Sequence, residues 1–334
     1  MIARAHVPPL LTQRTLMTEF AVGRVMRADA KSYLVAIEGE TRSFVPRGKL
    51  FDVKDEGDKS PVVVGDMVRV SLDGDPPGVE EVLPRRNYLP RVASSHDPRQ
   101  QILFANVDQL FLVSSVAKPT FSSNRADRIL AACRYHEIPA CLILNKLDLD
   151  KDDQAREIAR TYEEAGVEVI PSCATEGRGL EPLAARMRGK TSAFYGGSGA
   201  GKSTLLNALE PGLALKTGKI SKYWDQGKHT TTHSQMHRLG SHDAWVIDTP
   251  GIRVFRLTGI NKAELPDCFP EFAPFAGRCR FGRSCSHDHE PGCAVFAAVE
   301  AGKLAPTRYA SYVEILDELV PPPPDDTPEP PPEG

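Results

Sequence analysis

The sequence lacks any long hydrophobic run and any strong excess of charge of one sign. Membrane-spanning helices need roughly 20 consecutive apolar residues, and no stretch of this chain approaches that length. Its N-terminal segment also lacks the continuous apolar core of a secretory signal. We therefore expect a cytoplasmic protein with no membrane partner. The formal net charge is −3, so nucleic-acid contacts would have to come from local basic patches.

Composition and length fit a globular protein of more than one domain. Hydrophobic residues make up 41% and charged residues 25% of the chain, which excludes a mostly disordered or fibrous protein. The 334 residues exceed what one small core organises, so two or three domains are expected. Of the seven cysteines, four lie between residues 268 and 293. Without an export signal, this cluster favours a metal site over disulfides.

Residues 19–91 predict a small β-barrel, preceded by a flexible tail over residues 1–18. Five short β-rich runs, broken by Gly, Asp and Pro, follow one another at close spacing. This spacing and the size of the segment fit an OB-fold, and another kind of small β-domain is the alternative.

Residues 92–257 predict a mostly parallel α/β domain. Apolar runs of five to seven residues, suited to strands buried on both faces, alternate with segments of helical spacing. Residues 258–319 hold the cysteine cluster and end in an amphipathic segment, so a mainly helical domain is expected there. Residues 320–334 are rich in proline and acidic residues, and we expect them to form a disordered tail.

The segment GGSGAGKS at residues 196–203 matches the phosphate-loop pattern G-x-x-x-x-G-K-[ST] in full. It follows the apolar run TSAFY and opens the helical segment STLLNALE, which is the strand–loop–helix context that this motif requires. Lys202 is expected to reach the β- and γ-phosphates in catalysis, and the Ser203 hydroxyl to bind Mg²⁺. A chance glycine-rich loop is the alternative. The predicted nucleotide contacts are Gly197, Ser198, Gly199, Ala200, Gly201, Lys202, Ser203 and Thr204.

Two segments further along the chain are expected to complete the phosphate side of the site. Asp248, in DTPG after the apolar run AWVI, can hold Mg²⁺ through water, and the N–H of Gly251 can face the γ-phosphate. By itself, this segment could be a plain turn. The segment GKHTTT at residues 227–232 lies between the phosphate loop and DTPG and offers a threonine hydroxyl for Mg²⁺. This contact would order the loop only when the γ-phosphate is present. We assign this role to Thr231, although the pattern does not distinguish it from its two threonine neighbours, and a β-branched strand start is the alternative.

The segment NKLD at residues 145–148 is the element that reads guanine in the small-GTPase superfamily. A buried Asp148 carboxylate would accept both N1–H and the exocyclic amine of guanine, a donor pair that adenine lacks. The segment SCAT at residues 172–175 resembles the companion element whose backbone contacts guanine O6. A P-loop ATPase is the alternative, and NKLD argues against it. The predicted contacts are Asn145, which ties neighbouring loops, Lys146, which lies along the base or ribose, Asp148, Ser172, Cys173 and Ala174.

The order of these motifs is that of a circularly permuted GTPase, because the base-reading segments precede the phosphate loop. By these motifs and the cysteine cluster, the chain resembles the ribosome-small-subunit-dependent GTPase family (RsgA, also called YjeQ) over roughly residues 20–315. The resemblance implies an OB-fold, a permuted GTPase domain and a zinc-binding C-terminal domain. It also implies Mg²⁺-dependent GTP hydrolysis that the 30S subunit stimulates, contacts with 16S rRNA and a role late in 30S assembly. We expect the protein to be a monomer. The alternative to this GTPase function is an RNA-binding nucleotide switch in which hydrolysis is incidental.

The water-orienting residue is not in its usual place. Ile252 follows DTPG, where many GTPases have glutamine, and an isoleucine side chain cannot orient water. His229 resembles the histidine of the family's R/K-H-T-T motif, so we assign it a catalytic role. A loop histidine that contacts rRNA or an aspartate is the alternative.

The spacing Cys279-x₅-Cys285-x-His287-x₅-Cys293 supplies three thiolates and one imidazole, the closed set of a structural zinc site. The family pattern has four residues between the first two cysteines, whereas this chain has five, so Cys268 and His289 are alternative ligands. Reduced cysteines that merely pack are a further alternative.

Two groups of arginines with interleaved aromatic residues are candidates for RNA contact, by phosphate pairing and base stacking. A solvated basic face is the alternative for both. The first group is Arg85, Arg86 and Arg91 around Asn87 and Tyr88, and the second is Arg278, Arg280 and Arg283 with Phe281.

Overall fold

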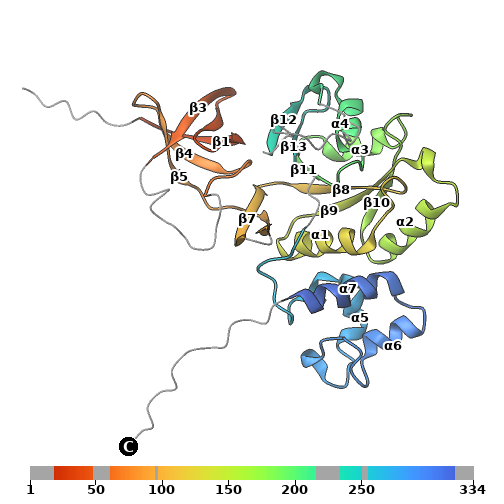
Figure 1. Cartoon of the computed structure of the whole chain (residues 1–334). Coiled ribbons are helices and arrows are strands. Elements are labelled where there is room, and N and C mark those ends of the chain that lie inside the picture. Colours follow the sequence, from red (N-terminus) through yellow and green to blue (C-terminus); the bar gives the residue numbers. More distant parts are fainter. Residues whose placement is uncertain (1–18, 48–60, 95–96, 216–233, 250–254, 320–334) are drawn as a thin grey trace, which may run out of the picture.

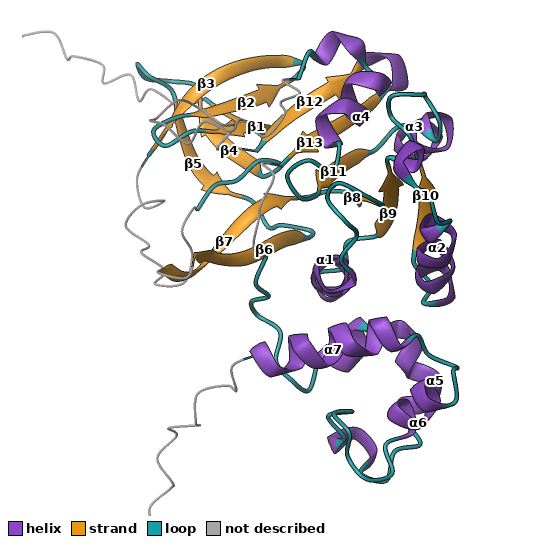
Figure 2. Cartoon of the chain, turned by 45° about the vertical axis from the view of Figure 1, so that its right-hand side comes forward, coloured by secondary structure: helices purple, strands orange, loops and turns teal. Residues whose placement is uncertain are grey.

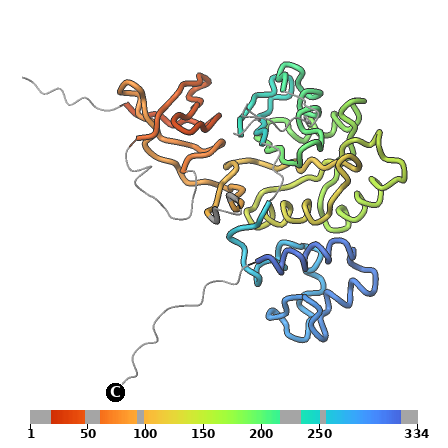
Figure 3. The backbone as a smooth tube through the Cα atoms, viewed as in Figure 1, coloured from red at the N-terminus to blue at the C-terminus, as the bar shows by residue number. Residues whose placement is uncertain are grey.

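A computed structural model of the chain describes residues 19–47, 61–94, 97–215, 234–249 and 255–319. They form three bodies, which Figure 1 shows as a barrel of strands, a central sheet with helices on both faces, and a helical unit beside the central one. Figure 3 follows the backbone through them in that order along the chain. Within these ranges every helix is too short or too polar to cross a bilayer.

The N-terminal body is a closed barrel of five strands. The strands run in the order β1-β2-β3-β5-β4, and β4 pairs back with β1 to close the barrel. Alternate side chains face inward, so Val25, Val35 and Phe44 are fully buried in its core. The predicted OB-type barrel is confirmed. Its strands are β1 (Phe20–Ala28), β2 (Tyr33–Ile37), β3 (Glu40–Pro46), β4 (Met67–Ser71) and β5 (Gly78–Val82).

A hairpin that the sequence analysis did not predict follows the barrel. Strands β6 (Tyr88–Ser94) and β7 (Asp97–Ala105) pair antiparallel as a separate two-stranded sheet. The predicted domain limit after Arg91 falls inside β6. The hairpin joins the first two bodies, because Ala105 N donates to Val64 O beside the barrel and the Tyr88 ring lies 4.9 Å from the ring of His136.

The strands of the central body run in the order β10-β9-β8-β11-β13-β12, parallel except for β12. Strand β12 also pairs with β1, so the sheet continues into the barrel. Both faces are buried: Leu110 and Leu112 of β8 pack with helices α1 and α2, and Phe111 and Val113 pack with α3 and α4. Figure 2 shows these helices around the strands. The predicted α/β architecture is confirmed. The elements are β8 (Gln109–Ser115), α1 (Ser123–Tyr135), β9 (Ala140–Asn145), α2 (Gln154–Glu164), β10 (Glu168–Pro171), α3 (Leu180–Met187), β11 (Thr191–Tyr195), α4 (Lys202–Leu209), β12 (Gln235–Leu239) and β13 (Ala244–Asp248).

The C-terminal body is mainly helical, as predicted. Its helices α5 (Ala273–Ala276), α6 (Ala294–Glu300) and α7 (Pro306–Glu318) are joined by turns and single-turn helices. Phe269 and Phe272 stack in its core, and Tyr312 packs edge-on against both, with ring centroids 5.0–5.4 Å apart.

Helix α7 packs on α1 of the central body (Figure 2). A buried ionic network lies at this contact. The Arg308 guanidinium of α7 pairs with Asp127 on α1 at 2.5 Å and with Glu271 at 2.7 Å. It also lies over the rings of Tyr162 and Phe269, at 5.2 and 5.0 Å. The Tyr162 hydroxyl of α2 donates to the same Asp127 oxygen, so helices of two domains meet at one carboxylate.

Candidate nucleotide site and metal centre

The phosphate loop joins β11 to α4 at the carboxyl edge of the central sheet. A Cβ on Gly196 would lie 2.3 Å from Val113 O of the neighbouring strand, and one on Gly201 would lie 2.2 Å from Asn145 Nδ2. Gly201 also has a backbone φ of +100°, which residues other than glycine rarely adopt. These glycines let the loop backbone approach β8 and the base-reading segment, and α4 then begins with its N–H groups facing the loop.

Lys202 and Asp248 lie near enough at the phosphate loop for their charges to affect each other. Lys202 is 8% exposed, and its Nζ donates to Gly196 O at 3.3 Å. Burial lowers the pKa of Lys202, and the nearby Asp248 carboxylate opposes that change. Burial likewise raises the pKa of Asp248, against the effect of Lys202. Within the described residues, the buried Asp248 Oδ1 has no hydrogen-bond partner, so it remains an acceptor for a ligand.

Thr249 follows Asp248 at the end of β13, and the sequence analysis did not single it out. It is 1% exposed, and its hydroxyl donates to Phe194 O of β11 at 2.7 Å. Its place in the DTPG segment was the available signal. Because Phe194 is also the sheet partner of Asp248, the end of β13 is held beside the end of β11, where the phosphate loop begins.

Asn145 joins the three loops that the sequence assigns to one nucleotide. The side chain is 1% exposed at the end of β9, and its Nδ2 donates to Ala200 O of the phosphate loop at 3.0 Å. Its Oδ1 accepts from Ala174 N at 3.2 Å and from the Ser172 hydroxyl at 3.3 Å. One amide group therefore holds the base-reading segment, its companion SCAT and the phosphate loop together.

These three loops surround a cavity of about 110 Å³, whose walls come from all of the predicted guanine-side segments. Lys146, at a φ of +67°, extends its Nζ to Lys118 O at 2.5 Å. Burial lowers the pKa of Lys146, and the Asp148 carboxylate opposes this. The lining residues are Asn145, Lys146, Asp148, Ala174, Thr175, Gly201 and Thr204.

The expectation that Asp148 is buried is wrong for this structure, in which the residue is exposed. It lies on the single-turn helix η2 (Leu147–Leu149), which follows the last residue of β9 and so stands beyond the edge of the sheet. Its carboxylate lines the cavity from the solvent side, where a bound base would have to cover it.

A second, larger cavity of about 1150 Å³ lies beside the phosphate loop. It extends from Gly197 and Ser198 along α1 to Glu318 and Leu319 at the end of α7. The C-terminal body thus forms part of a cleft that begins at the phosphate loop.

Three predicted site residues, His229, Thr231 and Gly251, lie outside the described residues. The structure brings together the other predicted residues of the nucleotide site, from residues 145–148, 172–174, 197–204 and 248, at one edge of the central sheet.

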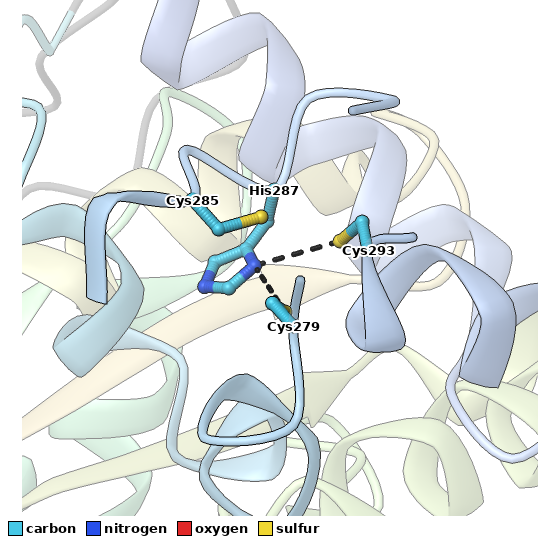
Figure 4. A group of neighbouring side chains, drawn as sticks. All are labelled: Cys279, Cys285, His287 and Cys293. Atoms are coloured by element: carbon cyan, nitrogen blue, oxygen red, sulfur yellow. Dashed lines mark hydrogen bonds between the residues drawn. The ribbon is translucent and has the colours of Figure 1, made fainter. Parts of the chain in front are cut away.

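The four predicted metal ligands converge in the C-terminal body (Figure 4). Cys279, Cys285, His287 and Cys293 are buried, and their ligand atoms all lie within 4.8 Å of one another. His287 Nδ1 is 3.5 Å from the sulfur atoms of both Cys279 and Cys293. Three thiols and one imidazole in this arrangement fit a closed tetrahedral metal site.

Neighbouring groups hold these ligands in place. The backbone N–H of Ala294 donates to Cys279 Sγ at 3.3 Å, and that of Phe296 donates to Cys293 Sγ at 3.4 Å. Such donors stabilise thiolates. The two alternative ligands lie apart from the cluster: the Cys268 thiol donates to Glu264 O, and exposed His289 pairs with Asp288.

The two arginine groups have different environments. Arg85 pairs with the buried Asp66 at 2.7 Å, and buried Asn87 bonds to the backbone of Val107 through both side-chain atoms. Arg85 and Asn87 therefore serve the joint between the barrel and the central body. The Arg86 side chain is 59% exposed and pairs with Asp108, and an RNA contact by this group stays a prediction. In the second group, Phe281 is 49% exposed beside the Arg280 guanidinium. Arg278, Arg280 and Arg283 are all exposed.

Comparisons with known proteins agree with this arrangement. The family model described as RsgA GTPase matches residues 82–258. A curated relative from Bordetella pertussis, the "Small ribosomal subunit biogenesis GTPase RsgA", is 40% identical over 302 residues, covering 89% of this chain and 96% of the relative. A relative of the same name from Flavobacterium johnsoniae is 37% identical over 303 residues, covering 88% and 92%.

Solved structures give the same result. YjeQ from Thermotoga maritima is 31% identical, with a TM-score of 0.70 over 90% of this chain and 99% of that one. YloQ, described as a circularly permuted GTPase, is 30% identical, with a TM-score of 0.64 over 90% and 95%.

Proposed function

The chain belongs to the RsgA GTPase family and is a GTP hydrolase of ribosome biogenesis, and from this premise we propose a more specific role. It hydrolyses GTP with Mg²⁺, is stimulated by the small ribosomal subunit, binds 16S rRNA and acts as a checkpoint late in 30S assembly. It works as a monomer in the cytoplasm.

The observation that carries this proposal is the three-way contact of Asn145. Its amide joins NKLD, SCAT and the phosphate loop around one cavity, although these segments are shuffled in the sequence. Guanine in that cavity would meet the Asp148 carboxylate and the backbone of Ala174. The β- and γ-phosphates would then extend toward Lys202 and the start of α4.

The phosphate side supplies the groups that hydrolysis needs. The buried Asp248 Oδ1, which has no hydrogen-bond partner among the residues that the structure describes, and the Ser203 hydroxyl would hold magnesium, with Thr231 proposed as a further ligand. When bound, Mg²⁺ would neutralise charge on the β- and γ-phosphates. Water would attack the γ-phosphorus, and the bond between the γ-phosphorus and the β–γ bridging oxygen would break. Lys202 would stabilise the negative charge that develops in this step. His229 would orient that water, and Gly251 would contact the γ-phosphate.

The C-terminal body supplies a structural zinc site and an RNA surface. The four buried ligands of the Cys₃His cluster leave no position for substrate, which favours a structural zinc ion. Exposed arginines and Phe281 beside the cluster offer charge for phosphates and a ring for stacking. We expect binding of the small subunit to weaken with added salt.

The test is a GTPase assay with isolated 30S subunits, with 50S subunits and with neither, using GTP and ATP. We expect hydrolysis of GTP alone, with a low basal rate that only 30S subunits raise. His229→Ala should lose the stimulation by 30S subunits, and full stimulated turnover in this variant would show that the assignment of His229 is wrong. Equal rates with and without 30S subunits would instead favour a binding switch, and equal use of ATP would contradict the guanine site.

A further inference from the structure

The larger cavity, of about 1150 Å³, takes its walls from both the central and the C-terminal bodies. Residues of α1 line one side of it, and Ile315 and Leu319 line it at the end of α7. Three aromatic residues also belong to the lining, namely Phe121, Tyr195 and Phe255. The rings of Tyr195 and Phe255 meet edge to face, with their centroids 5.8 Å apart. The cavity therefore offers an aromatic wall at the junction of the two bodies.

The same cavity carries an excess of positive charge. Its lining holds Arg125, Arg128 and Arg256, and Glu318 is the one acidic residue among the lining residues that the structure describes. The Arg128 guanidinium donates to both oxygens of Glu318 at 2.5 Å, so this pair is neutral. Arg125 and Arg256 are exposed, and neither forms an ion pair within the described ranges. Arg125 lies one helical turn, about 5 Å along α1, from Arg128. Both unpaired arginines therefore line the cavity that the end of α7 borders.

Residues 320–334, which lie outside the described residues, have the composition that such a wall attracts. They follow Leu319 directly, so the segment starts at the cavity. Eight of them are proline, four are acidic and none is basic. Proline-rich segments bind aromatic-lined grooves because the polyproline II conformation is set before binding, and little chain entropy is lost. Covalent attachment beside the cavity adds a high effective concentration.

We propose that the larger cavity is the docking site of the chain's own segment 320–334. Pro321–Pro324 lie against the aromatic wall and span about 12 Å as polyproline II. The acidic pair Asp325–Asp326 then follows closely enough to Leu319 to meet the two unpaired arginines of the cavity. Exposed charge pairs contribute little on their own, so the proline contacts and the covalent tether supply the rest of the binding. Docked there, the segment occupies the cleft that leads to the phosphate loop.

The experiment attaches a nitroxide to the segment in the full-length protein, at Thr327→Cys, and records NMR amide signals. All seven native cysteines are buried, so the label reacts at the new, exposed position. Signals of residues 121–126 and 255–260 should lose at least half of their intensity relative to the reduced, diamagnetic label. Arg125→Glu should restore most of that intensity, because it replaces attraction with repulsion. Salt at about 0.5 M should act in the same direction, since it screens exposed charges.

Arg160→Glu serves as the matched control. It makes the same change of charge at an exposed arginine of α2 that does not line the cavity, and it should leave the broadening as in the unsubstituted protein. Arg125 is exposed in the first turn of α1, where a glutamate favours the helix, so its variant should fold. Absence of broadening at the cavity, or broadening confined to residues 278–283, would overturn the proposal. Equal recovery in both variants would also overturn it, because the attraction would then be unspecific.

Discussion

Replacement of Arg308 by methionine should weaken the junction between the central and C-terminal bodies by about 3–5 kcal/mol. The Arg308 side chain is 4% exposed, and the carboxylates of Asp127 and Glu271 with which it pairs are 0% and 8% exposed. Methionine keeps the length and apolar volume of the side chain but carries no charge. Both carboxylates would remain buried without this cation, and an uncompensated buried charge costs the quoted energy.

This cost should depend on pH in one direction. Burial raises the pKa of Asp127 and of Glu271, and Arg308 opposes the rise. Without Arg308, both folded-state pKa values rise further above those of the unfolded chain. Such a carboxyl contributes stability below its unfolded pKa and loses it as pH rises through its folded pKa. The loss of junction stability in Arg308→Met, relative to wild type, should therefore be largest near about pH 8 and smaller near about pH 5.

Native-state hydrogen exchange of the α7 amides measures the opening free energy of this junction. The matched control is Arg160→Met, which removes an exposed pair with Glu164 in which the arginine side chain is 77% exposed. It should cost less than about 0.5 kcal/mol. A deficit below about 1 kcal/mol for Arg308→Met, or one that grows as the pH falls, would refute the reasoning.

Three further changes test the site. Cys285→Ser should reduce the zinc content from about one ion per chain to none and expose the α6 and α7 amides to exchange, because the site needs all four ligands; a folded, metal-free wild type would contradict this. Asp148→Asn should weaken GDP binding at least tenfold and favour xanthosine diphosphate in competition titrations, because an amide can donate to the xanthine O2; unchanged GDP affinity would exclude Asp148 from base reading. Gly196→Ala should destabilise the protein by about 1–3 kcal/mol in thermal unfolding, since its Cβ would lie 2.3 Å from Val113 O. Gly197→Ala is the control, because a Cβ there meets nothing within 4 Å, and equal losses in both variants would argue against the packing.

The sequence was informative wherever a short-range pattern determines the structure. Short β-rich runs, such as those that contain Val25 and Val35, predict strands, and both valines are buried in the core of the barrel. Uninterrupted apolar runs such as QLFLV predict strands buried on both faces, and β8 is one of them. The metal ligands were predictable for a similar reason, because all four lie within residues 279–293.

The contacts that the sequence did not predict join residues that no local sequence pattern marks. Arg308 pairs with Asp127 across 181 positions of sequence, and nothing in either helix distinguishes these charges from exposed ones. Arg85 is similar: its basic neighbours favoured an RNA surface, but the buried Asp66 neutralises it. The exposure of Asp148 was unpredictable because it depends on where η2 ends relative to the sheet edge.

The C-terminal body is connected to the central body at two places, which lie on different sides of the proposed nucleotide site. Its chain follows β13, which ends at Asp248 on the phosphate side. Its last helix, however, docks on α1 and α2, which flank the base-reading segment. The loop that leads into α1 carries Lys118, whose carbonyl accepts from Lys146 Nζ. The covalent link therefore starts on the phosphate side of the proposed nucleotide site, whereas the ionic network lies on helices that flank its base-reading side.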